Sequence, residues 1–356
     1  MARPLPDILP VPWPAELPEP PARTEQAVAR AAAVLAAGGL VAIPTETVYG
    51  LAADALDPEA VDRIFAAKGR PATNPLIVHV SDTAMARALS AAWPEAAERI
   101  TASLWPGPVT VVVPRGPKIS DVITAGGETV ALRCPEHRLT RRLIATVGRP
   151  LAAPSANRSL QLSPTTAGHV LDGLGNRIDL ILDGGPCGRG IESTVVDCTV
   201  DPPRILRPGP ISRGALEAVL GTAVLEAEQT LEGRAASDAR SAPVRSPGTL
   251  SRHYAPKTPL EISTTAADRV ASLVESGRRV AWLTTQTDDP RVRSLASMQN
   301  VLVVPMPDDP TAFATGLYAA LHAIDRRSLD TIVVDTPPDT EAWRAVADRL
   351  RRAAKA

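Results

Sequence analysis

The stretch VAIPTETVYGLAADALDPEAVDRIFAAKGRPATNPLIVHV, residues 41–80, decides the fold of this chain. Its opening apolar run, residues 40–43, predicts a strand that stops at a proline and enters a loop rich in hydroxyl groups. A helix is expected to begin after Asp57, a good N-cap residue followed by proline, and to end at Gly69, which suits a left-handed C-cap. The run Leu76–Val80 predicts a second strand. This strand–helix–strand order indicates an α/β fold.

Side chains suited to an anion gather around the ends of these elements. The loop supplies a hydroxyl group, the helix end supplies a lysine and an arginine, and the following turn and strand supply an amide and an imidazole. Because two strand ends bring these groups into one neighbourhood, the sequence predicts an anion site. Taken singly, a Lys-x-Arg pair is usually a solvated helix end, and a strand histidine is usually a core residue. The residues concerned are Thr47, Lys68, Arg70, Asn74 and His79.

Composition narrows the class of protein. The 356 residues are enough for two domains, and the formal net charge of −1 provides no general attraction to nucleic acid or to anionic membranes. Aromatic residues make up 3% of the chain, which leaves little material for stacking on bases. The longest apolar run, residues 31–43, is too short to span a bilayer, and nothing resembles a signal peptide. We therefore expect a soluble cytoplasmic protein.

Several common motifs for metals, disulfides and phosphates are missing from the sequence. Its three cysteines form no CxxC pair, and no HxH or HExxH occurs, so neither a disulfide framework nor a tightly held metal is expected. There is no GxxxxGK[ST] segment and no GxGxxG after a strand, so neither a Walker site nor a dinucleotide fold is supported. Phosphate would have to be bound by Lys68, Arg70, Arg207 and loop hydroxyl groups.

Four segments of the chain differ in composition. Residues 1–22 contain eight prolines and predict an extended or polyproline-like leader without regular structure. Residues 23–220 carry strand and helix patterns that predict the larger domain. Residues 221–257 lose periodicity and predict a linker, although the cluster RHYAP at 252–256 is too specific to be filler. Residues 258–356 alternate strand and helix patterns, which predicts a small parallel sheet with helices on its faces.

Local patterns predict the remaining elements. Thr24 is expected to cap the first helix, and the β-branched run Val109–Val113 predicts a buried strand. The other expected elements of the larger domain are strands at 129–133, 151–153, 180–182 and 193–197 and helices at 95–104, 139–147 and 212–220; those of the smaller domain are strands at 260–263, 280–283, 301–304 and 331–334 and helices at 266–275, 311–324 and 340–352.

Further candidate residues each have an ordinary structural alternative. The SAN segment at 155–157 follows a predicted strand, where small side chains let a ligand approach backbone N–H groups, but the same segment suits a plain turn. Arg133 at a strand end suits either a ligand or a neighbouring carboxylate. Arg138 and three later arginines form a basic patch that is either a solvated face or an RNA contact. Cys134 has no partner motif for a nucleophile and is expected in the core.

A series of longer motifs runs through the larger domain and the linker. In chain order these are PTETVYGL, KGR followed by NPLIVH, WPGPVT, TVALRCP, APSAN, SPT, GIEST and RPGP, and then SPG with HYAP. The series resembles the YrdC/Sua5 family over residues 23–256, and its last two motifs resemble the linker of the longer Sua5 branch. The tail is compatible with the C-terminal Sua5 domain. The family's KxR and SxN sets are present as Lys68, Arg70, Ser155 and Asn157.

This resemblance implies an L-threonylcarbamoyladenylate synthase, which combines L-threonine, bicarbonate and ATP, releases pyrophosphate and supplies the t6A transferase machinery that modifies tRNA. It implies a YrdC-like twisted open α/β sheet joined by a linker to a smaller Rossmann-like α/β domain, with Mg2+ arriving on the ATP. The residues implied for L-threonine are Thr47, His79, Arg133 and Ser193. Those implied for ATP are Arg70, Asn74, Thr129, Ala153, Ser155, Ser163, Arg207 and Tyr254, with Lys68 and Arg70 as catalytic residues and Tyr254 as part of a lid.

Two other functions stay open at this point. A non-catalytic RNA-binding YrdC-like module would need a basic surface and stacking residues, which the near-neutral charge and scarce aromatic residues do not favour. A carbamoyl-transfer enzyme of the hydrogenase-maturation type shares the KxR and SxN sets, but no acylphosphatase-like or zinc-finger segment precedes the domain here. Release of pyrophosphate that requires both L-threonine and bicarbonate separates the three.

Overall fold

The computed structural model describes residues 4–13, 17–226 and 254–354, and these residues form two compact units. The described residues of the first unit fall within 1–158, 164–188 and 192–249, and those of the second fall within 159–163, 189–191 and 250–356. Two short segments that the sequence assigned to the larger domain therefore belong to the second unit. Most of the predicted linker, residues 227–253, lies outside the described residues.

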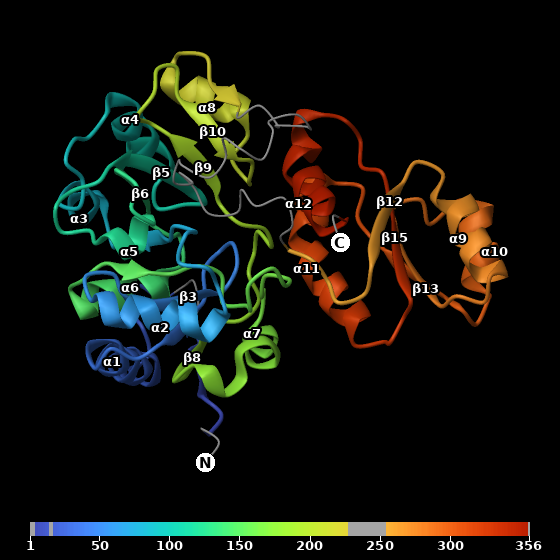
Figure 1. Ribbon diagram of the computed structural model, residues 1–356, viewed down its shortest axis with the longest axis horizontal. Coiled ribbons are helices and arrows are strands. Elements are labelled where there is room, and N and C mark those ends of the chain that lie inside the picture. The colour runs from blue at the N-terminus through green and yellow to red at the C-terminus, as the bar shows by residue number, and fades with distance from the viewer. Residues whose placement is uncertain (1–3, 14–16, 227–253, 355–356) are drawn as a thin grey trace. The chain divides into compact units, whose positions relative to one another are not determined.

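The first unit is built on one eleven-stranded mixed sheet (Figure 1). The strands lie in the order β1-β8-β2-β3-β7-β4-β6-β5-β9-β10-β11. Their bounds are β1 Asp7–Pro10, β2 Val41–Ile43, β3 Gly50–Asp54, β4 Ile77–His79, β5 Val109–Pro114, β6 Thr129–Arg133, β7 Leu151–Ala152, β8 Leu180–Asp183, β9 Thr194–Asp197, β10 Arg204–Arg207 and β11 Leu225–Glu226. This sheet confirms the α/β architecture expected from the sequence.

Helices and apolar clusters cover both faces of this sheet. The strand β3 shows why both faces are apolar, because Leu51 and Ala53 belong to one buried cluster and Ala52 to another. Helix α2 packs on β3, while α1 packs against α6. The helices are α1 Ala22–Ala36, α2 Pro58–Lys68, α3 Thr83–Arg87, α4 Glu95–Leu104, α5 Asp121–Thr124, α6 Arg138–Val147, α7 Ala167–Leu174 and α8 Arg213–Leu220, with a 3-10 turn η1 at Gly175–Arg177.

Local capping fixes the ends of α2 as the sequence predicted. The Asp57 side chain accepts hydrogen bonds from the backbone N–H groups of Glu59 and Ala60, and Gly69 has φ +61° in the left-handed region. The helix therefore stops with Lys68 in its last turn, which sets where that side chain enters the structure. Strand β3, which precedes α2, was not predicted, because GLAAD contains no β-branched or aromatic residue.

The proline-rich leader contains regular structure, so the prediction of none is wrong. Strand β1 pairs in parallel with β8, because extended residues between prolines can still donate and accept at a sheet edge. The predicted cap at Thr24 is also wrong. Helix α1 begins two residues earlier, and the Thr24 hydroxyl instead donates to the carbonyl oxygen of Pro12 at 2.8 Å. Strand β11 likewise extends regular structure into the segment predicted as linker.

The second unit contains a four-stranded sheet in the order β12-β15-β13-β14, with all three strand pairs parallel. This confirms the small parallel sheet expected from the sequence. Helix α10 was not predicted. The strands are β12 Leu260–Ser263, β13 Val280–Thr284, β14 Val301–Pro305 and β15 Thr331–Asp335, and the helices are α9 Ala266–Glu275, α10 Pro290–Ala296, α11 Pro310–Asp325 and α12 Arg344–Ala354, with a 3-10 turn η2 at Glu341–Trp343.

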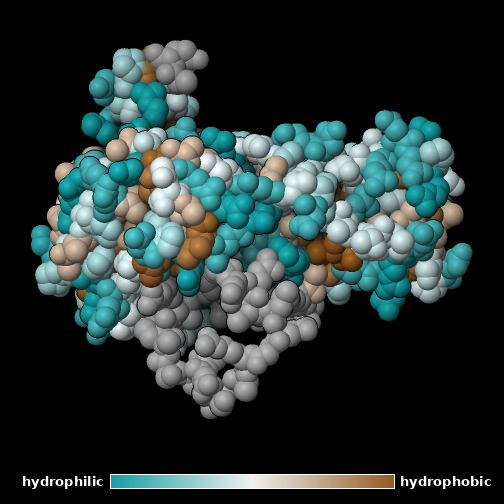
Figure 2. Space-filling model, turned by 90° about the horizontal axis from the view of Figure 1, so that it is seen from above, coloured by the Kyte–Doolittle hydropathy of each residue, from teal (hydrophilic) through white to brown (hydrophobic). Residues whose placement is uncertain are grey.

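Large exposed hydrophobic residues are few among the described positions. Figure 2 shows a face on which hydrophilic and weakly polar residues prevail and brown patches are small. The exposed large hydrophobic residues are Leu5, Ile8, Leu17, Leu160, Leu225 and Met298. Within the described ranges, every helix is too short or too polar to cross a bilayer.

Candidate active site

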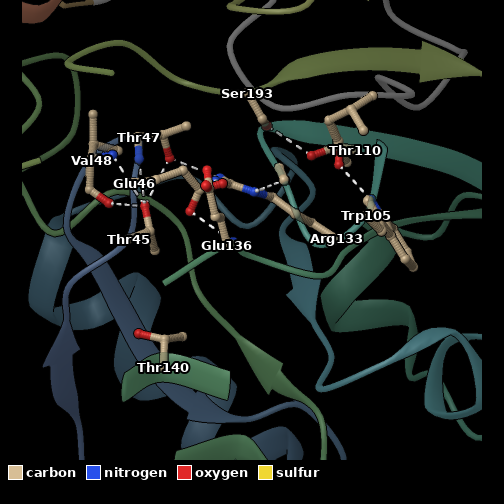
Figure 3. Close-up of polar contacts among 12 residues, drawn as sticks. Thr45, Glu46, Thr47, Val48, Trp105, Thr110, Arg133, Glu136, Thr140 and Ser193 are labelled. Atoms are coloured by element: carbon tan, nitrogen blue, oxygen red, sulfur yellow. Dashed lines mark hydrogen bonds and ion pairs between the residues drawn. The ribbon is translucent and has the colours of Figure 1, made fainter. Parts of the chain in front are cut away.

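Threonine hydroxyl groups hold the loop after β2 in shape. Thr45 Oγ1 accepts hydrogen bonds from the backbone N–H groups of Thr47 at 3.1 Å and Val48 at 3.2 Å, and it donates to the Val48 carbonyl at 2.6 Å. Thr140 on α6 donates to the carbonyl of Pro44 at the start of the loop. Such turns arise when a hydroxyl satisfies nearby backbone groups. The loop therefore presents the side chains of Glu46 and Thr47 in fixed positions (Figure 3).

Arg133, the last residue of β6, reaches this loop with its guanidinium group. Its Nη1 donates to Thr47 Oγ1 at 2.9 Å, and its Nη2 donates to Glu46 Oε1 at 2.6 Å (Figure 3). The Arg133 Nε contacts the Gly107 carbonyl at 3.4 Å. The ion pair is buried, with 5% of the Arg133 side chain and 9% of the Glu46 side chain exposed. The other oxygen of Glu46 accepts from the Glu136 backbone N–H at 3.1 Å.

His79 lies beside Arg133, because β4 and β6 pair in parallel with these two residues in register. Burial and then the nearby Arg133 charge lower the pKa of His79 to about 3, against the weaker opposing effect of a hydrogen bond to the Ile77 backbone. The imidazole is therefore neutral at pH 7. Its Nδ1 is buried and finds no hydrogen-bond partner in the described part of the chain. This geometry leaves a neutral ring nitrogen next to a cation, in a position to hydrogen-bond a ligand.

Ser193, the residue directly before β9, joins this group. Its hydroxyl lies 2.8 Å from Thr110 Oγ1, which is on β5, the strand paired with β6 (Figure 3). The Arg207 guanidinium donates to the Ser193 carbonyl through Nε at 3.1 Å and to the Ser193 hydroxyl through Nη2 at 3.1 Å. Thus Thr47, His79, Arg133 and Ser193 gather where β4 and β6 end, with Arg207 one contact further out.

Lys68 points into the protein rather than toward solvent. Its Nζ donates to the backbone carbonyls of Ser155 and Asn157 and, at 3.3 Å, to Asn157 Oδ1. Burial and then the Arg70 charge lower the pKa of Lys68 well below its ordinary value. Three oxygen acceptors match the three donors of an ammonium group. The structure therefore places Lys68 as the support of the Ser155–Asn157 loop, which joins the KxR and SxN sets in space.

Arg70 and Asn74 form a second buried pair. Arg70 donates through Nε to the Asn74 carbonyl at 3.3 Å and through Nη2 to the Pro75 carbonyl at 3.0 Å. Asn74 is 4% exposed, yet neither atom of its side-chain amide has a partner among the described residues. A buried amide without partners is costly unless a ligand or water completes it. Asn74 therefore has two buried polar atoms that a ligand could bind, and its ligand role stays a prediction.

The remaining predicted nucleotide residues of the first unit lie around these two groups. Ser155 donates to Asn157 Oδ1 at 2.6 Å and forms an isolated bridge with Gly50. Ala153 is 5% exposed, and its N–H donates to the Ile77 carbonyl at 3.0 Å. Thr129 begins β6 and is half-buried.

The predicted single neighbourhood is therefore only partly right. Thr129 and Arg133 are the first and last residues of β6, so their backbones are roughly 13 Å apart along the strand. Since β4 runs parallel to β6, Asn74 lies before the start of the pair and His79 at its end. The predicted residues thus lie toward both ends of two neighbouring strands, and the loop that carries Thr47 leads into Gly50, which bridges Ser155. A ligand with two separated polar ends fits such an arrangement.

Ser163 and Tyr254 belong to the second unit. Ser163 is fully buried, and its carbonyl lies 3.1 Å from His322 Nε2. The Tyr254 ring is 1% exposed, lies 6.0 Å from the Tyr318 ring and stands under the Arg349 guanidinium at 5.1 Å. The lid position of Tyr254 over a nucleotide stays a prediction.

Sequence reasoning missed Glu46. This residue accepts from Arg133 and from the Glu136 N–H, so it is as central to the group as Thr47. The sequence did offer a sign of this role, because PTET places a carboxylate between two threonines. A buried arginine at a strand end commonly pairs with such a carboxylate.

Comparison with known families identifies the class of protein. A family model of the Sua5, YciO and YrdC proteins, described as telomere recombination, matches residues 33–209. A second model, described as the C-terminal domain of threonylcarbamoyl-AMP synthase, matches residues 211–355. The chain therefore belongs to the Sua5/YrdC family, in the branch that carries this C-terminal domain.

Individual relatives place the chain more narrowly. It is 42% identical to the threonylcarbamoyl-AMP synthase of Bacillus subtilis over 332 residues, which cover 92% of each chain. It is 39% identical to the threonylcarbamoyl-AMP synthase of Pyrococcus abyssi over 323 residues, 91% of this chain and 92% of the relative. The crystal structure of P. abyssi Sua5 complexed with L-threonine matches with a TM-score of 0.85 and 36% identity, covering 98% of this chain and 97% of that chain.

Proposed function

We propose that this chain is a threonylcarbamoyl-AMP synthase, which converts L-threonine, bicarbonate and ATP into L-threonylcarbamoyladenylate and pyrophosphate. The observation that carries the proposal is the buried Arg133 guanidinium at the end of β6. An arginine has five N–H donors, and three of those on Arg133 meet protein acceptors in the described structure. Two donors therefore remain for a carboxylate. The relatives named above carry the same activity in their names.

The threonine end of the site follows from this geometry. The substrate carboxylate would lie against the two remaining donors of Arg133, since a guanidinium fork matches a carboxylate. Thr47 and Ser193 supply hydroxyl groups that already point at Arg133 or its neighbours. His79, neutral at pH 7, can hydrogen-bond the ammonium or hydroxyl group of threonine through Nδ1 without repelling a cation. These four residues are proposed to hold L-threonine.

The nucleotide end is proposed at the start of β4 and β6. Arg70 supplies charge, and the Asn74 amide supplies an NH2 donor group and an acceptor oxygen that need partners. Lys68 holds the Ser155–Asn157 loop, so we propose that it positions the nucleotide-binding backbone there as well as adding positive charge. The other residues of the first unit proposed to contact ATP are Thr129, Ala153, Ser155 and Arg207, whereas the nucleotide contacts of Ser163 and Tyr254, which belong to the second unit, stay predictions.

The proposed chemistry needs orientation more than a strong base. The free amine of threonine attacks the carbon of bicarbonate, a C–N bond forms, and water leaves to give the carbamate. A carbamate oxygen then attacks the α-phosphorus of ATP, and pyrophosphate leaves on the opposite side. Arg133 would hold the amino acid, while Arg70 before the start of β4 and Arg207 beside Ser193 would neutralise phosphate charge. Such positioning and charge neutralisation account for most catalysis of this type.

The setting of the reaction is part of the proposal. Mg2+ would enter as part of the ATP complex; the described residues contain no group of three or more His, Cys, Asp or Glu side chains able to hold a metal. A substrate-borne ion fits this, because Mg2+ commonly takes its ligands from phosphates and water. The adenylate product would pass to the t6A transferase machinery acting on tRNA, in the cytoplasm where ATP and tRNA occur.

Omission of single substrates tests the function. Purified full-length protein is incubated with Mg2+-ATP, L-threonine and bicarbonate, and pyrophosphate is measured. Release should fall to background when either L-threonine or bicarbonate is omitted. Release that continues unchanged without L-threonine would overturn the proposal and would favour a hydrolase or a carbamoyl-transfer activity.

A further inference from the structure

Glu46 stands at the centre of the threonine end of the site, although the sequence reading and the proposed mechanism give it no role. It is the carboxylate that pairs with Arg133 at 2.6 Å, and both side chains are largely buried. Burying such a pair removes both groups from water, which is costly unless geometry and further hydrogen bonds compensate. The second oxygen of Glu46 is satisfied by the Glu136 N–H. Both oxygens of Glu46 are therefore bound within the protein, and this buried ion pair calls for a functional reason.

We propose that Glu46 is a positioning and selectivity residue for the amino acid substrate: it fixes the Arg133 guanidinium so that two N–H donors face the threonine carboxylate, and it balances the Arg133 charge so that phosphate-type anions are not drawn to this end of the site. The inference rests on the proposed function, because it assumes that Arg133 receives the substrate carboxylate.

The acceptors around the Arg133 guanidinium fix its orientation. Glu46 takes a donor on Nη2, Thr47 takes a donor on Nη1, and Gly107 faces Nε. One donor on each terminal nitrogen is then left, and two such donors form the fork that binds a carboxylate. Without Glu46 the whole guanidinium group could change its orientation. The two remaining N–H donors would then no longer be held toward the carboxylate of the substrate.

Positive charge is distributed unevenly among the buried residues of the first unit. Lys68, Arg70, Arg133 and Arg207 are all buried cations of the first unit. Among the described ion pairs, Arg133 has a carboxylate partner in Glu46, whereas the recorded acceptors of Lys68 are uncharged oxygens. A neutral Glu46–Arg133 pair attracts the multiply charged triphosphate less than a bare guanidinium does. It still binds an amino acid, because the zwitterion brings an ammonium group that the Glu46 charge favours.

The matched control is Asp54, the last residue of β3. Its carboxylate accepts from the Leu56 N–H at 2.8 Å and pairs with Arg149 at 2.5 Å, so it makes the same two kinds of contact as Glu46. It contacts none of the residues proposed to bind substrate in any recorded interaction. Asp54→Asn therefore reports the cost of losing a paired carboxylate in this unit without touching the threonine end.

The experiment is isothermal titration of L-threonine into full-length wild-type, Glu46→Gln and Asp54→Asn proteins, with and without inorganic phosphate. We expect Glu46→Gln to raise the Kd for L-threonine about tenfold or more and Asp54→Asn to change it less than twofold. Phosphate in large excess should leave the wild-type Kd within twofold and should weaken binding to Glu46→Gln further. An unchanged Kd for the folded Glu46→Gln protein would overturn the inference.

Two further measurements keep the test decisive. Glu46→Asp retains the charge but shortens the side chain, so its Kd should lie between those of wild type and Glu46→Gln; a value equal to that of Glu46→Gln would show that charge balance is irrelevant. Should the variants not fold, strong competition between phosphate and L-threonine in the wild-type protein would itself overturn the charge-balance argument. Failure of the proposed function is distinguishable, because then the wild-type protein would release no threonine-dependent pyrophosphate.

Discussion

Replacing Lys68 by methionine separates two roles that a buried lysine near a nucleotide can have. Methionine has a similar length and no charge, so it removes the contacts of Nζ with Ser155, Asn157 O and Asn157 Oδ1 with little change in volume. If the ammonium group supports the loop, the protein itself is destabilised. If its donors serve mainly the phosphates of ATP, stability is unaffected and only nucleotide binding weakens.

The structure sets the size of the expected effect. Hydrogen bonds from a charged donor contribute about 1.5–3 kcal/mol each, and a buried carbonyl left without a partner costs about 1–3 kcal/mol. Burying an ammonium group is itself costly, as the lowered pKa of Lys68 indicates. Methionine removes that cost, which offsets part of the loss. We therefore expect a net loss of about 2–4 kcal/mol in the free energy of unfolding of the first unit. For a unit of this size that corresponds to a decrease in Tm of roughly 4–16 °C.

The assay is differential scanning calorimetry of the full-length protein without ligands, following the transition that includes the first unit. Lys118→Met is the matched control, because Lys118 is an exposed lysine of the same unit. The control should change Tm by about 1 °C or less. A Lys68→Met protein with the Tm of the control and a raised KM for ATP would refute the support role and would place the ammonium donors on the substrate.

Three other changes test other parts of the site. Arg133→Lys keeps the positive charge but loses the two-pronged donor geometry of a guanidinium. In pyrophosphate-release kinetics, KM for L-threonine should therefore rise about 10- to 100-fold while KM for ATP stays within twofold. Equal shifts in both KM values would contradict a threonine-specific role. Because the pKa of His79 is about 3 when folded and 6.5 when unfolded, only the unfolded chain gains this proton between those values. The free energy of unfolding should therefore fall as pH decreases from 6.5 toward 3, by up to about 1.4 kcal/mol per pH unit. His79→Asn should flatten this dependence of stability on pH, and an identical slope in the variant would contradict the role given to His79. At Gly209 an added Cβ would lie 2.3 Å from the Thr194 backbone nitrogen, so Gly209→Ala should lower Tm and weaken L-threonine binding. Gly188→Ala is the control, because no atom lies within 4 Å of its added Cβ, and it should match wild type in both measurements.

The parts of the fold that sequence predicted well are those fixed by neighbouring residues. Helix α2 was predicted to its ends, because Asp57 and Gly69 cap it through contacts within a few residues. Strand β3 depends on pairing with β2 and with β7, which lies about 100 positions later, and its own residues have low strand propensity. The same holds for β1, whose partner β8 lies about 170 positions later, and for β11 beside β10.

The site shows the same division. The candidates Thr47, His79 and Arg133 were found as residue types at strand ends, and the sheet register does bring them together. The direction in which Lys68 points could not be predicted, because it depends on where the Ser155–Asn157 loop returns in space. Glu46 escaped notice because its role depends on Arg133, a residue 87 positions away.

The central claim is that the Arg133 guanidinium, held by Thr47 and Glu46, receives the carboxylate of the amino acid substrate. The most direct measurement compares the Kd values of L-threonine and L-threoninamide, which lacks only the carboxylate charge, by titration into the wild-type protein. We predict that L-threoninamide binds at least about 100-fold more weakly, the size expected when a buried cation loses its charged partner. Equal affinity for the two compounds would contradict the account.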